Sequence, residues 1–255
     1  TALASTTVKE YRYFPSIGST NDEALRWVDS GAPDFSLVVA DEQTAGRGRF
    51  DRRWVTNPGA ALAFSLILHP APSELASLAL FAPLCGLALR ETLHRQYGLQ
   101  SQIKWPNDVL LAGKKTAGIL VEAAWLGDKA TGMVLGIGIN ITRAALPPPS
   151  ARLFPATCLE EHLAAPMDRS TLLAQLLNRL ATWRSRLGTP RFFDEWQKHL
   201  AFKGQSVRIE DSQKTSIIGV VKGVNPRGNL VLTLANGLEQ DFAAGDVHLR
   251  PLDLQ

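Results

Sequence analysis

Residues 102–125, QIKWPNDVLLAGKKTAGILVEAAW, decide the fold class of this chain. Three apolar and β-branched segments, at 102–105, 109–111 and 116–125, are separated only by tight turns. A fourth segment with interspersed glycines follows at 131–141. Consecutive strands at such short spacing are typical of hairpins. They predict a mixed or antiparallel sheet and argue against repeated βαβ units.

Helices are expected on both sides of this segment in the sequence. Thr20, with Glu23 three residues later, has the spacing of a capping box, and Gly31 suits the end of the helix that follows. The other predicted helices are 73–97 (kinked or split at Pro83), 171–187 with a leucine-rich face, and 189–202; the other predicted strands are 36–40 and 61–68. The fold class is therefore α+β, a mixed β-sheet with flanking helices.

The chain changes character at Gly204. Short alternating segments then follow one another with tight turns between them, at 206–210, 216–224, 230–234, 239–242 and 247–249. About 50 residues of short strands and turns are typical of a small β-barrel. We expect a domain boundary near Lys203, which divides the chain into residues 1–202 and 203–255.

Composition limits the class of protein. The chain has 255 residues, 45% of them hydrophobic and 20% charged, with 27 Lys and Arg against 24 Asp and Glu. These values exclude disordered, collagen-like and coiled-coil chains, and a net charge of +3 is too small for a nucleic-acid coat protein. Two cysteines, Cys85 and Cys158, are too few for a disulfide framework.

The sequence predicts a cytoplasmic protein without a membrane anchor. No basic segment followed by an apolar run occurs in the first residues. The most apolar long stretch, 75–89, is expected to be too short to span a bilayer and contains Pro83. We therefore expect neither membrane nor nucleic acid among the partners of this chain.

The segment 41–57 is a long polar loop without periodicity, and loops of that length in compact domains are usually functional. It contains Gly46-Arg47-Gly48-Arg49, followed by Arg52 and Arg53. Glycines expose backbone N–H groups, and arginines bind phosphate or carboxylate with two parallel hydrogen bonds. The loop is a candidate anion site, and the alternative is a solvated basic loop. It matches neither a Walker loop nor a dinucleotide fingerprint.

Three further segments could carry chemistry. Lys104-Trp105-Pro106-Asn107-Asp108 places polar side chains at a strand end, although an ordinary turn is the alternative. Lys115, in the run 113–118, could act as a point charge near a phosphate, or it could belong to a charged hairpin tip. Alternate glycines in Gly136–Asn140 indicate close approach of a ligand or another backbone, or a plain packing requirement. The five histidines occur in unrelated contexts, so no catalytic triad is supported.

Taken in order, these segments resemble the biotin–protein ligase family. The strings that carry the resemblance are Ser19-Thr20-Asn21, Gly46–Arg49, Lys104–Asp108, Gly118–Glu122 and Gly136–Asn140, and it extends over roughly residues 13–250. The family implies a class II synthetase-like biotin/lipoate ligase catalytic domain followed by an SH3-like domain. It also implies a two-step reaction in which biotin and MgATP form biotinyl-5′-AMP, and biotin then passes to a lysine of a biotin carboxyl carrier protein.

The resemblance also implies roles for individual residues. Arg47, Arg49, Lys104, Asp108 and Lys115 would be catalytic. Biotin would bind to Ser19, Thr20, Asn21, Gln43, Arg47, Gly48, Arg49, Lys115 and Gly118. ATP and the adenylate would bind to Arg49, Arg52, Trp54, Asn107 and Asn140, whereas no metal ligands are assigned. The strand 136–141 would pair with its copy if the protein forms a homodimer.

Two departures from the family pattern bear on function. Phe50 and Asp51 stand where the commoner loop has Arg-Gly, which loses a glycine and adds a negative charge, so closure of the loop could differ. Only about 18 residues precede Ser19, so we expect a form without the N-terminal DNA-binding domain of some members.

Two other functions compete with this interpretation. A lipoate or octanoate ligase or transferase resembles the family in fold, but the Gly-Arg-Gly-Arg and Lys-Trp-Pro-Asn-Asp strings argue against it. A non-catalytic biotin sensor or adaptor is the second alternative, and the intact set of arginines and lysines disfavours it.

Overall fold

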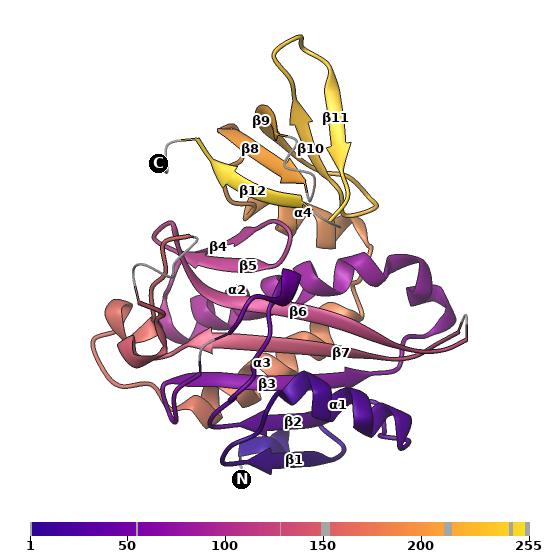
Figure 1. The fold of residues 1–255 in the computed structure, drawn as a ribbon, viewed down its shortest axis with the longest axis vertical. Helices are drawn as coiled ribbons and strands as arrows, with labels where there is room; N and C mark the ends of the chain where they lie inside the picture. Colours follow the sequence, from indigo (N-terminus) through magenta and orange to yellow (C-terminus); the bar gives the residue numbers. More distant parts are fainter. Residues whose placement is uncertain are drawn as a thin grey trace.

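In the computed structural model, residues 2–54, 56–127, 129–148, 154–211, 216–244 and 247–252 are described. Two sheets form within these residues (Figure 1). The larger has the order β1-β2-β3-β7-β6-β5-β4: β1 (Tyr11–Phe14), β2 (Ser36–Ala40), β3 (Ala61–Leu68), β4 (Ser101–Lys104), β5 (Asp108–Leu111), β6 (Lys114–Leu126) and β7 (Lys129–Asn140). The helices are α1 (Thr20–Asp29), α2 (Phe81–Tyr97), α3 (Arg169–Arg184) and α4 (Pro190–Lys198). This arrangement confirms the predicted α+β class.

The larger sheet is mixed because its first pair is parallel. β1 runs parallel to β2, whereas the other neighbouring strands are antiparallel. Strands β4 to β7 follow one another as hairpins, as the sequence predicts. β1 was not predicted: it is a four-residue edge strand, and half of its side chains, including Tyr11 and Tyr13, are exposed.

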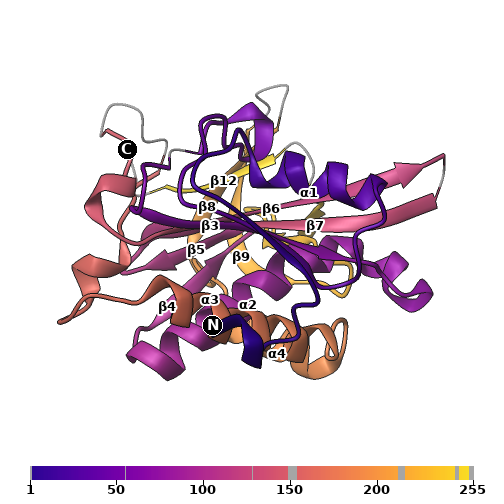
Figure 2. The same ribbon diagram turned by 90° about the horizontal axis from the view of Figure 1, so that it is seen from below.

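Helices cover both faces of this sheet. Seen from below, α1 lies on one side and α2 and α3 lie on the other (Figure 2). The leucine-rich face of α3 and the buried face of α2 share one core with β3, β6 and β7. Fully buried leucines such as Leu84, Leu176 and Leu177 fill this layer. The sheet is therefore a rigid floor, and the segments that enter and leave its strands form the site.

The beginning of α1 differs from the prediction in its capping residue. Ser19, not Thr20, is the N-cap, and its hydroxyl accepts a hydrogen bond from the Asp22 N–H at 3.4 Å. The Thr20 hydroxyl instead donates to Gln43. The expected left-handed glycine follows the helix, since Gly31 has a φ of 85°.

The predicted helix 73–97 divides before Pro83. A 3₁₀ segment, Pro72–Leu80, leads directly into α2, and Pro83 lies in the first turn of α2, where a missing N–H is tolerated. The apolar stretch 75–89 lies within Pro72–Tyr97, which has 26 residues and is, by length and composition alone, long and apolar enough to cross a membrane. Half of its most apolar window is buried inside the protein, which is typical of a core helix.

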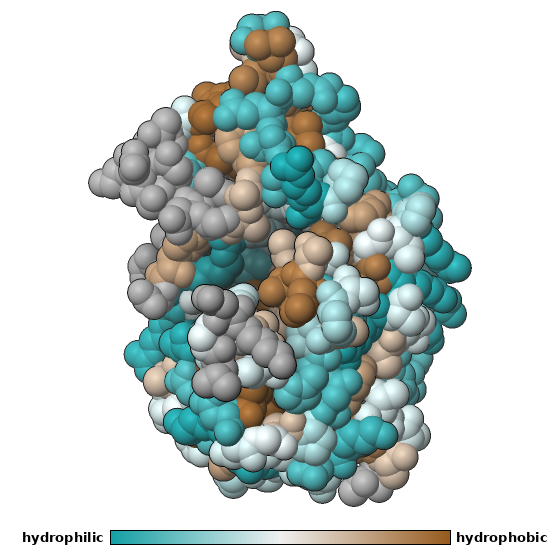
Figure 3. Space-filling model, turned by 90° about the vertical axis from the view of Figure 1, so that its right-hand side faces the viewer, coloured by the Kyte–Doolittle hydropathy of each residue, from teal (hydrophilic) through white to brown (hydrophobic). Residues whose placement is uncertain are grey.

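The C-terminal residues form a second, antiparallel sheet with the order β11-β10-β9-β8-β12. Its strands are β8 (Ser206–Asp211), β9 (Ser216–Val224), β10 (Leu230–Thr233), β11 (Glu239–Phe242) and β12 (Val247–Pro251). They agree closely with the predicted segments and are compatible with a small barrel. The helix before this sheet ends at Lys198, four residues earlier than predicted. The surface is hollowed below this sheet (Figure 3).

The predicted pairing of the strand 136–141 with its copy is wrong. These residues belong mainly to β7, which lies between β3 and β6 and is hydrogen-bonded to both. A strand with both edges occupied has no backbone groups left for a further strand.

Candidate functional site

One cavity of about 580 Å³ collects every site residue predicted from the sequence. Its floor is formed by β6 and β7, and its walls come from the start of α1, the loop 43–54, residues 104–108, residues 145–148 and residues 154–156. The predicted residues that line it are Ser19, Thr20, Asn21, Gln43, Arg47, Gly48, Arg49, Arg52, Trp54, Lys104, Asn107, Asp108, Lys115, Gly118 and Asn140. Residues far apart in the chain therefore line one cavity, and their individual roles remain predictions.

One end of the cavity is lined by neutral polar groups that bond to one another. The Thr20 N–H and hydroxyl both donate to Gln43 Oε1, at 2.8 and 2.9 Å. Ser65 Oγ lies 2.8 Å from Thr20 Oγ1 and 2.6 Å from Asn21 Oδ1. Thr20, Asn21 and Ser65 are buried, so their orientations are fixed by this network.

Acidic residues continue the network beyond Asn21. The Asn21 amide donates to Glu122 Oε2 at 2.6 Å and to the Leu120 carbonyl at 3.3 Å. The Arg47 guanidinium pairs with Glu122 at 3.1 Å and with Asp22 at 2.5 Å. Burial alone lowers the pKa of Arg47, but the two carboxylates outweigh it and raise the pKa. Arg47 therefore lies at the edge of the polar end, where its charge is balanced by Asp22 and Glu122 of the protein itself.

Two of the alternate glycines in β7 make room for different side chains. A Cβ on Gly136 would lie 2.8 Å from Asn21 Cγ and closer still to its Oδ1. A Cβ on Gly138 would lie 2.6 Å from Trp54 Cζ2. Real Cβ atoms do not approach so closely, so β7 carries glycine where the polar end and the indole of Trp54 rest on it. Trp54 also lies over Gly118 of β6, where a Cβ would be 3.0 Å from the ring.

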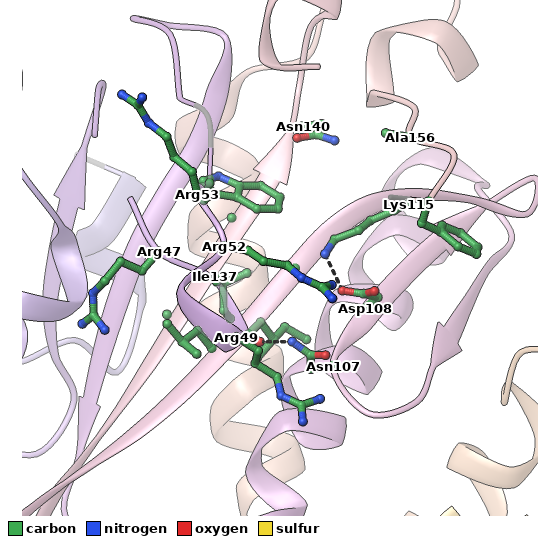
Figure 4. A pocket seen from close by; sticks show the side chains of 18 of the residues that line it. Arg47, Arg49, Arg52, Arg53, Asn107, Asp108, Lys115, Ile137, Asn140 and Ala156 are labelled. Carbon is green, nitrogen blue, oxygen red and sulfur yellow. Dashed lines mark hydrogen bonds and ion pairs between the residues drawn. The ribbon is translucent and has the colours of Figure 1, made fainter. Parts of the chain in front are cut away.

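The other end of the cavity contains a buried charged cluster. Asp108 lies between two lysines, with Lys104 Nζ 3.3 Å from Oδ2 and Lys115 Nζ 2.5 Å from Oδ1. Lys104 and Asp108 are each only 8% exposed. Figure 4 shows Lys115 and Arg52 both pointing toward Asp108.

The pKa values in this cluster follow its charges. Burial raises the pKa of Asp108, but the coulombic effects of Lys115 and Lys104 outweigh it and leave the pKa at about 2. Burial lowers the pKa of Lys104; Asp108 opposes that effect, and Lys115 and Arg52 add to it. Three cations around one carboxylate leave an excess of positive charge, which suits an anionic ligand.

Segments from opposite walls fix the cluster in place. The Asn107 amide donates to the Ile119 carbonyl at 2.7 Å, which ties the turn before β5 to β6. The segment around Ala156 runs beside the start of β6, with the Lys115 N–H donating to the Pro155 carbonyl at 2.7 Å. Next to it, the Asn140 amide donates to the Thr157 carbonyl at 3.1 Å. Asn140 and Lys115 are therefore held by the same segment.

The arginines of the loop diverge. The loop is folded back on itself, since the Trp54 N–H donates to the Gly46 carbonyl at 2.8 Å and the Gly48 N–H donates to the Arg52 carbonyl at 2.7 Å. Arg47, Arg49 and Arg53 point away from Asp108, whereas Arg52 points toward it (Figure 4). Arg49 donates to the carbonyl of Ala244, which lies just after β11.

The first departure from the family pattern is visible in the backbone. Phe50 adopts a φ of 60°, a left-handed conformation that an L-residue other than glycine, asparagine or aspartate rarely takes. Its ring lies 4.8 Å from the Arg49 guanidinium and 5.7 Å from that of Arg52. Aromatic–cation contacts thus accompany the strained conformation.

Sequence reasoning missed several lining or supporting residues. Ser65 could have been noticed as a single polar residue in the buried strand ALAFSLIL. Asp22 and Glu122 become partners of Arg47 only in the fold. Leu249 and Arg250 line the cavity from the C-terminal sheet, and no local pattern indicates that they do. Among the described residues, no group of three or more His, Cys, Asp or Glu side chains could hold a metal ion.

Comparison with known proteins decides the family. Residues 13–140 match the model of the biotin/lipoate A/B protein ligase family, and residues 202–250 match the biotin protein ligase C terminal domain. The chain belongs to the biotin/lipoate A/B protein ligase family. These matches include the site segments from Ser19 to Asn140 and the C-terminal sheet.

Individual relatives agree with this membership. The chain is 32% identical over 241 residues to the bifunctional ligase/repressor BirA of Bacillus spizizenii, covering 93% of this chain and 73% of that protein. It is 33% identical to the biotin–[acetyl-CoA-carboxylase] ligase of Paracoccus denitrificans, covering 84% and 90% respectively. The biotin protein ligase of Aquifex aeolicus, solved with biotin and ATP, superposes with a TM-score of 0.82 at 26% identity, covering 95% of this chain and 99% of that one.

Proposed function

We infer that this chain is an ATP-dependent biotin–protein ligase, which forms biotinyl-5′-AMP and transfers biotin to a lysine of a biotin carboxyl carrier protein. The observation that carries this function is the single cavity with a neutral polar end and a cationic end. Such a cavity suits a ligand with a neutral polar ring and a carboxylate, together with a nucleotide phosphate. The family membership and the relatives with biotin and ATP support the same conclusion.

We assign biotin to the neutral end. Thr20, Asn21 and Ser65 provide buried donors and acceptors, and Gln43 adds a half-buried amide; these groups suit the ureido ring of biotin. Arg47 contributes through Glu122, which holds the Asn21 amide, and Ser19 contributes as the cap of α1. In this assignment the biotin carboxylate extends toward Lys115, over Gly118.

We assign the nucleotide to the cationic end. Lys104, Lys115 and Arg52 surround the position of the α-phosphate, and Asp108 orients the two lysines. Asn140, with Trp54 nearby, faces the adenine, and Asn107 holds the wall beside them. Arg49 and Gly48 belong to the covering loop, which would shield the adenylate from water.

The proposed reaction needs fixed positive charge in the site and no nucleophile from the protein. A carboxylate oxygen of biotin attacks the α-phosphorus, an anhydride bond forms, and the bond to the β-phosphate breaks to release pyrophosphate. The carrier lysine then attacks the biotinyl carbonyl, AMP leaves, and the amine loses a proton. Two anions meet in the first step, so fixed cations stabilise its transition state.

Mg²⁺ is proposed to enter as part of the nucleotide substrate. Both oxygens of Asp108 are already paired with lysines, and the described residues offer no ready group of acidic ligands. Magnesium is commonly held by one or two carboxylates together with substrate phosphates, which is compatible with MgATP.

The remaining assignments are also proposals. We divide the chain into residues 1–202 and 203–255, because the two sheets are separate and the C-terminal family match begins at residue 202. We propose a cytoplasmic enzyme that acts without nucleic acid or membrane. A homodimer, if it forms, uses surfaces other than β7.

The test is pyrophosphate release from ATP with biotin or with lipoate, followed by transfer of biotin to a purified carrier domain. We expect turnover with biotin; turnover with lipoate alone would overturn the assignment. Lys115→Ala should lower the rate of adenylation by about 30- to 1000-fold, because it removes about 2–4 kcal/mol of transition-state stabilisation. Lys114→Ala is the matched control, since Lys114 is exposed and does not line the cavity. Equal rates for the two variants would exclude this role for Lys115.

A further inference from the structure

Trp105 joins the catalytic sheet to the C-terminal sheet. Its indole is only 1% exposed, and its Nε1–H donates to the Gly228 carbonyl at 3.1 Å. Gly228 lies 123 residues later, in the turn between β9 and β10. This hydrogen bond therefore links two parts of the chain that fold into different sheets.

The turn that carries Gly228 is tightly seated. Gly228 has a φ of 82°, and a Cβ there would lie 2.9 Å from Leu80 Cδ2 and 3.8 Å from Trp196 Cη2. The Gly228 N–H donates to the Asn225 carbonyl at 2.9 Å, which closes the turn. The Gly228 carbonyl is therefore presented to Trp105 in a fixed position.

Close packing is interrupted beside this contact between the sheets. A second cavity of about 260 Å³ lies beside it, and both Trp105 and Gly228 line that cavity, together with Trp196 and Ala244. Directed hydrogen bonds constrain geometry where close packing is interrupted. Trp105 supplies one such bond, and the loop residue Arg49 supplies another through Ala244.

The neighbours of Trp105 in the sequence belong to the cationic end of the main cavity. Lys104 precedes it, Pro106 and Asn107 follow it, and all three line that cavity, whereas Trp105 does not. A shift of the indole would therefore move Lys104 relative to its partner Asp108. Trp105 is buried on the opposite side of this short segment, against the C-terminal sheet.

We propose that Trp105 is a positioning residue: through its hydrogen bond to Gly228, the C-terminal sheet fixes the segment 104–108 and thereby the nucleotide end of the site. This inference rests on the proposed function for its nucleotide, but the link between the two sheets does not. Trp105 touches neither substrate. Its influence reaches the reaction through Lys104 and Asp108.

The experiment compares Trp105→Phe with Trp196→Phe in the full chain. Both indoles are fully buried and line the same second cavity, but Trp196 Nε1 has no hydrogen-bond partner among the described residues. Both variants therefore lose ring volume, but only Trp105→Phe also loses a hydrogen bond. The readouts are the KM values for ATP and biotin in pyrophosphate release, and amide hydrogen exchange in segments 104–108 and 225–229 without ligand.

For Trp105→Phe we expect a KM for ATP raised about 3- to 10-fold, as for loss of one buried hydrogen bond, and a KM for biotin within about twofold of the parent. Exchange should accelerate in both segments. Trp196→Phe should leave the ATP KM and exchange in 104–108 within about twofold of the parent. An unchanged ATP KM in Trp105→Phe, or equal effects of the two variants, would overturn the proposal.

If the parent protein forms no adenylate, the proposed function is wrong, and amide hydrogen exchange alone then tests the positioning role of Trp105. Accelerated exchange in both segments of Trp105→Phe, but not in 104–108 of Trp196→Phe, would still support the positioning link. Unchanged exchange in 104–108 of Trp105→Phe would refute it.

Discussion

Gly136→Ala should abolish tight binding of biotin while the chain still folds. Gly136 is the cross-strand partner of both Ser65 in β3 and Leu120 in β6. Both neighbours bond to Asn21, whose amide lies directly above Gly136. An added Cβ, 2.8 Å from Asn21 Cγ and closer to its Oδ1, has no space unless Asn21 moves.

The magnitude follows from what Asn21 would lose. It is 5% exposed, and both ends of its amide are held, by Ser65 at 2.6 Å and by Glu122 at 2.6 Å. A neutral hydrogen bond contributes about 0.5–1.5 kcal/mol and one to a charged group about 1.5–3 kcal/mol. A displaced Asn21 must be brought back into position when biotin binds, at a cost similar to the strength of the lost bonds: about 2–4 kcal/mol, or about 30- to 1000-fold in Kd.

The assay is titration calorimetry with biotin, combined with thermal unfolding. Gly18→Ala is the matched control, because Gly18 is exposed, next to the same helix cap, and a Cβ there would meet nothing within 4 Å. Gly18→Ala should bind biotin like the parent. A Kd for Gly136→Ala within about threefold of the parent, in a folded protein, would refute the assignment of this end to biotin.

Three other changes test the rest of the site. Gly138→Ala would displace the Trp54 indole and should raise the KM for ATP about tenfold without weakening biotin; a larger effect on biotin would contradict the placement of the two ends. Arg49→Gly should release biotinyl-AMP and label bystander proteins, and strictly carrier-only labelling would refute that role. Asp108→Asn should reduce the acid dependence of stability. Because folding depresses the pKa of Asp108 from 3.8 to about 2, its ionised form stabilises the fold above about pH 4, and this contribution is lost as pH falls through about 2. Between about pH 5 and about pH 2, the free energy of unfolding of Asp108→Asn should therefore fall by about 2 kcal/mol less than that of the parent protein, as measured by urea unfolding. An equal pH dependence of the two proteins would exclude the depressed pKa.

Local patterns were sufficient for the central strands. Strands β4 to β7 were predicted because turns that contain Asn107 and Gly113 separate their apolar runs, which are short in β4 and β5 and long in β6 and β7. β1 escaped prediction because four residues at a half-exposed edge carry little periodicity. Its pairing with β2 comes from the tertiary fold.

Partners distant in the sequence were the main source of error at the site. Both Ser19 and Thr20 can cap a helix. Ser19 is the cap here because the Thr20 hydroxyl donates a hydrogen bond to Gln43, which lies 23 residues later in the chain. Arg47 was predicted from its glycine-rich loop, but its ion pairs depend on Glu122, 75 residues later. The set of lining residues followed from ordered motifs, whereas the directions of their side chains required the fold.

Those directions change how the basic loop contributes to the site. Of its four arginines, Arg52 points toward Asp108, whereas Arg47 pairs with carboxylates and Arg49 donates to the Ala244 carbonyl just after β11. The charge at the cationic end therefore comes mainly from lysines outside the loop, with Asp108 as their internal counter-ion. An incoming phosphate can share these lysines without first assembling them, because their positions are set by Asp108 before the ligand binds. In the proposed reaction the two parts therefore have different roles: the preorganised lysines would stabilise the phosphate, and the loop would cover the adenylate.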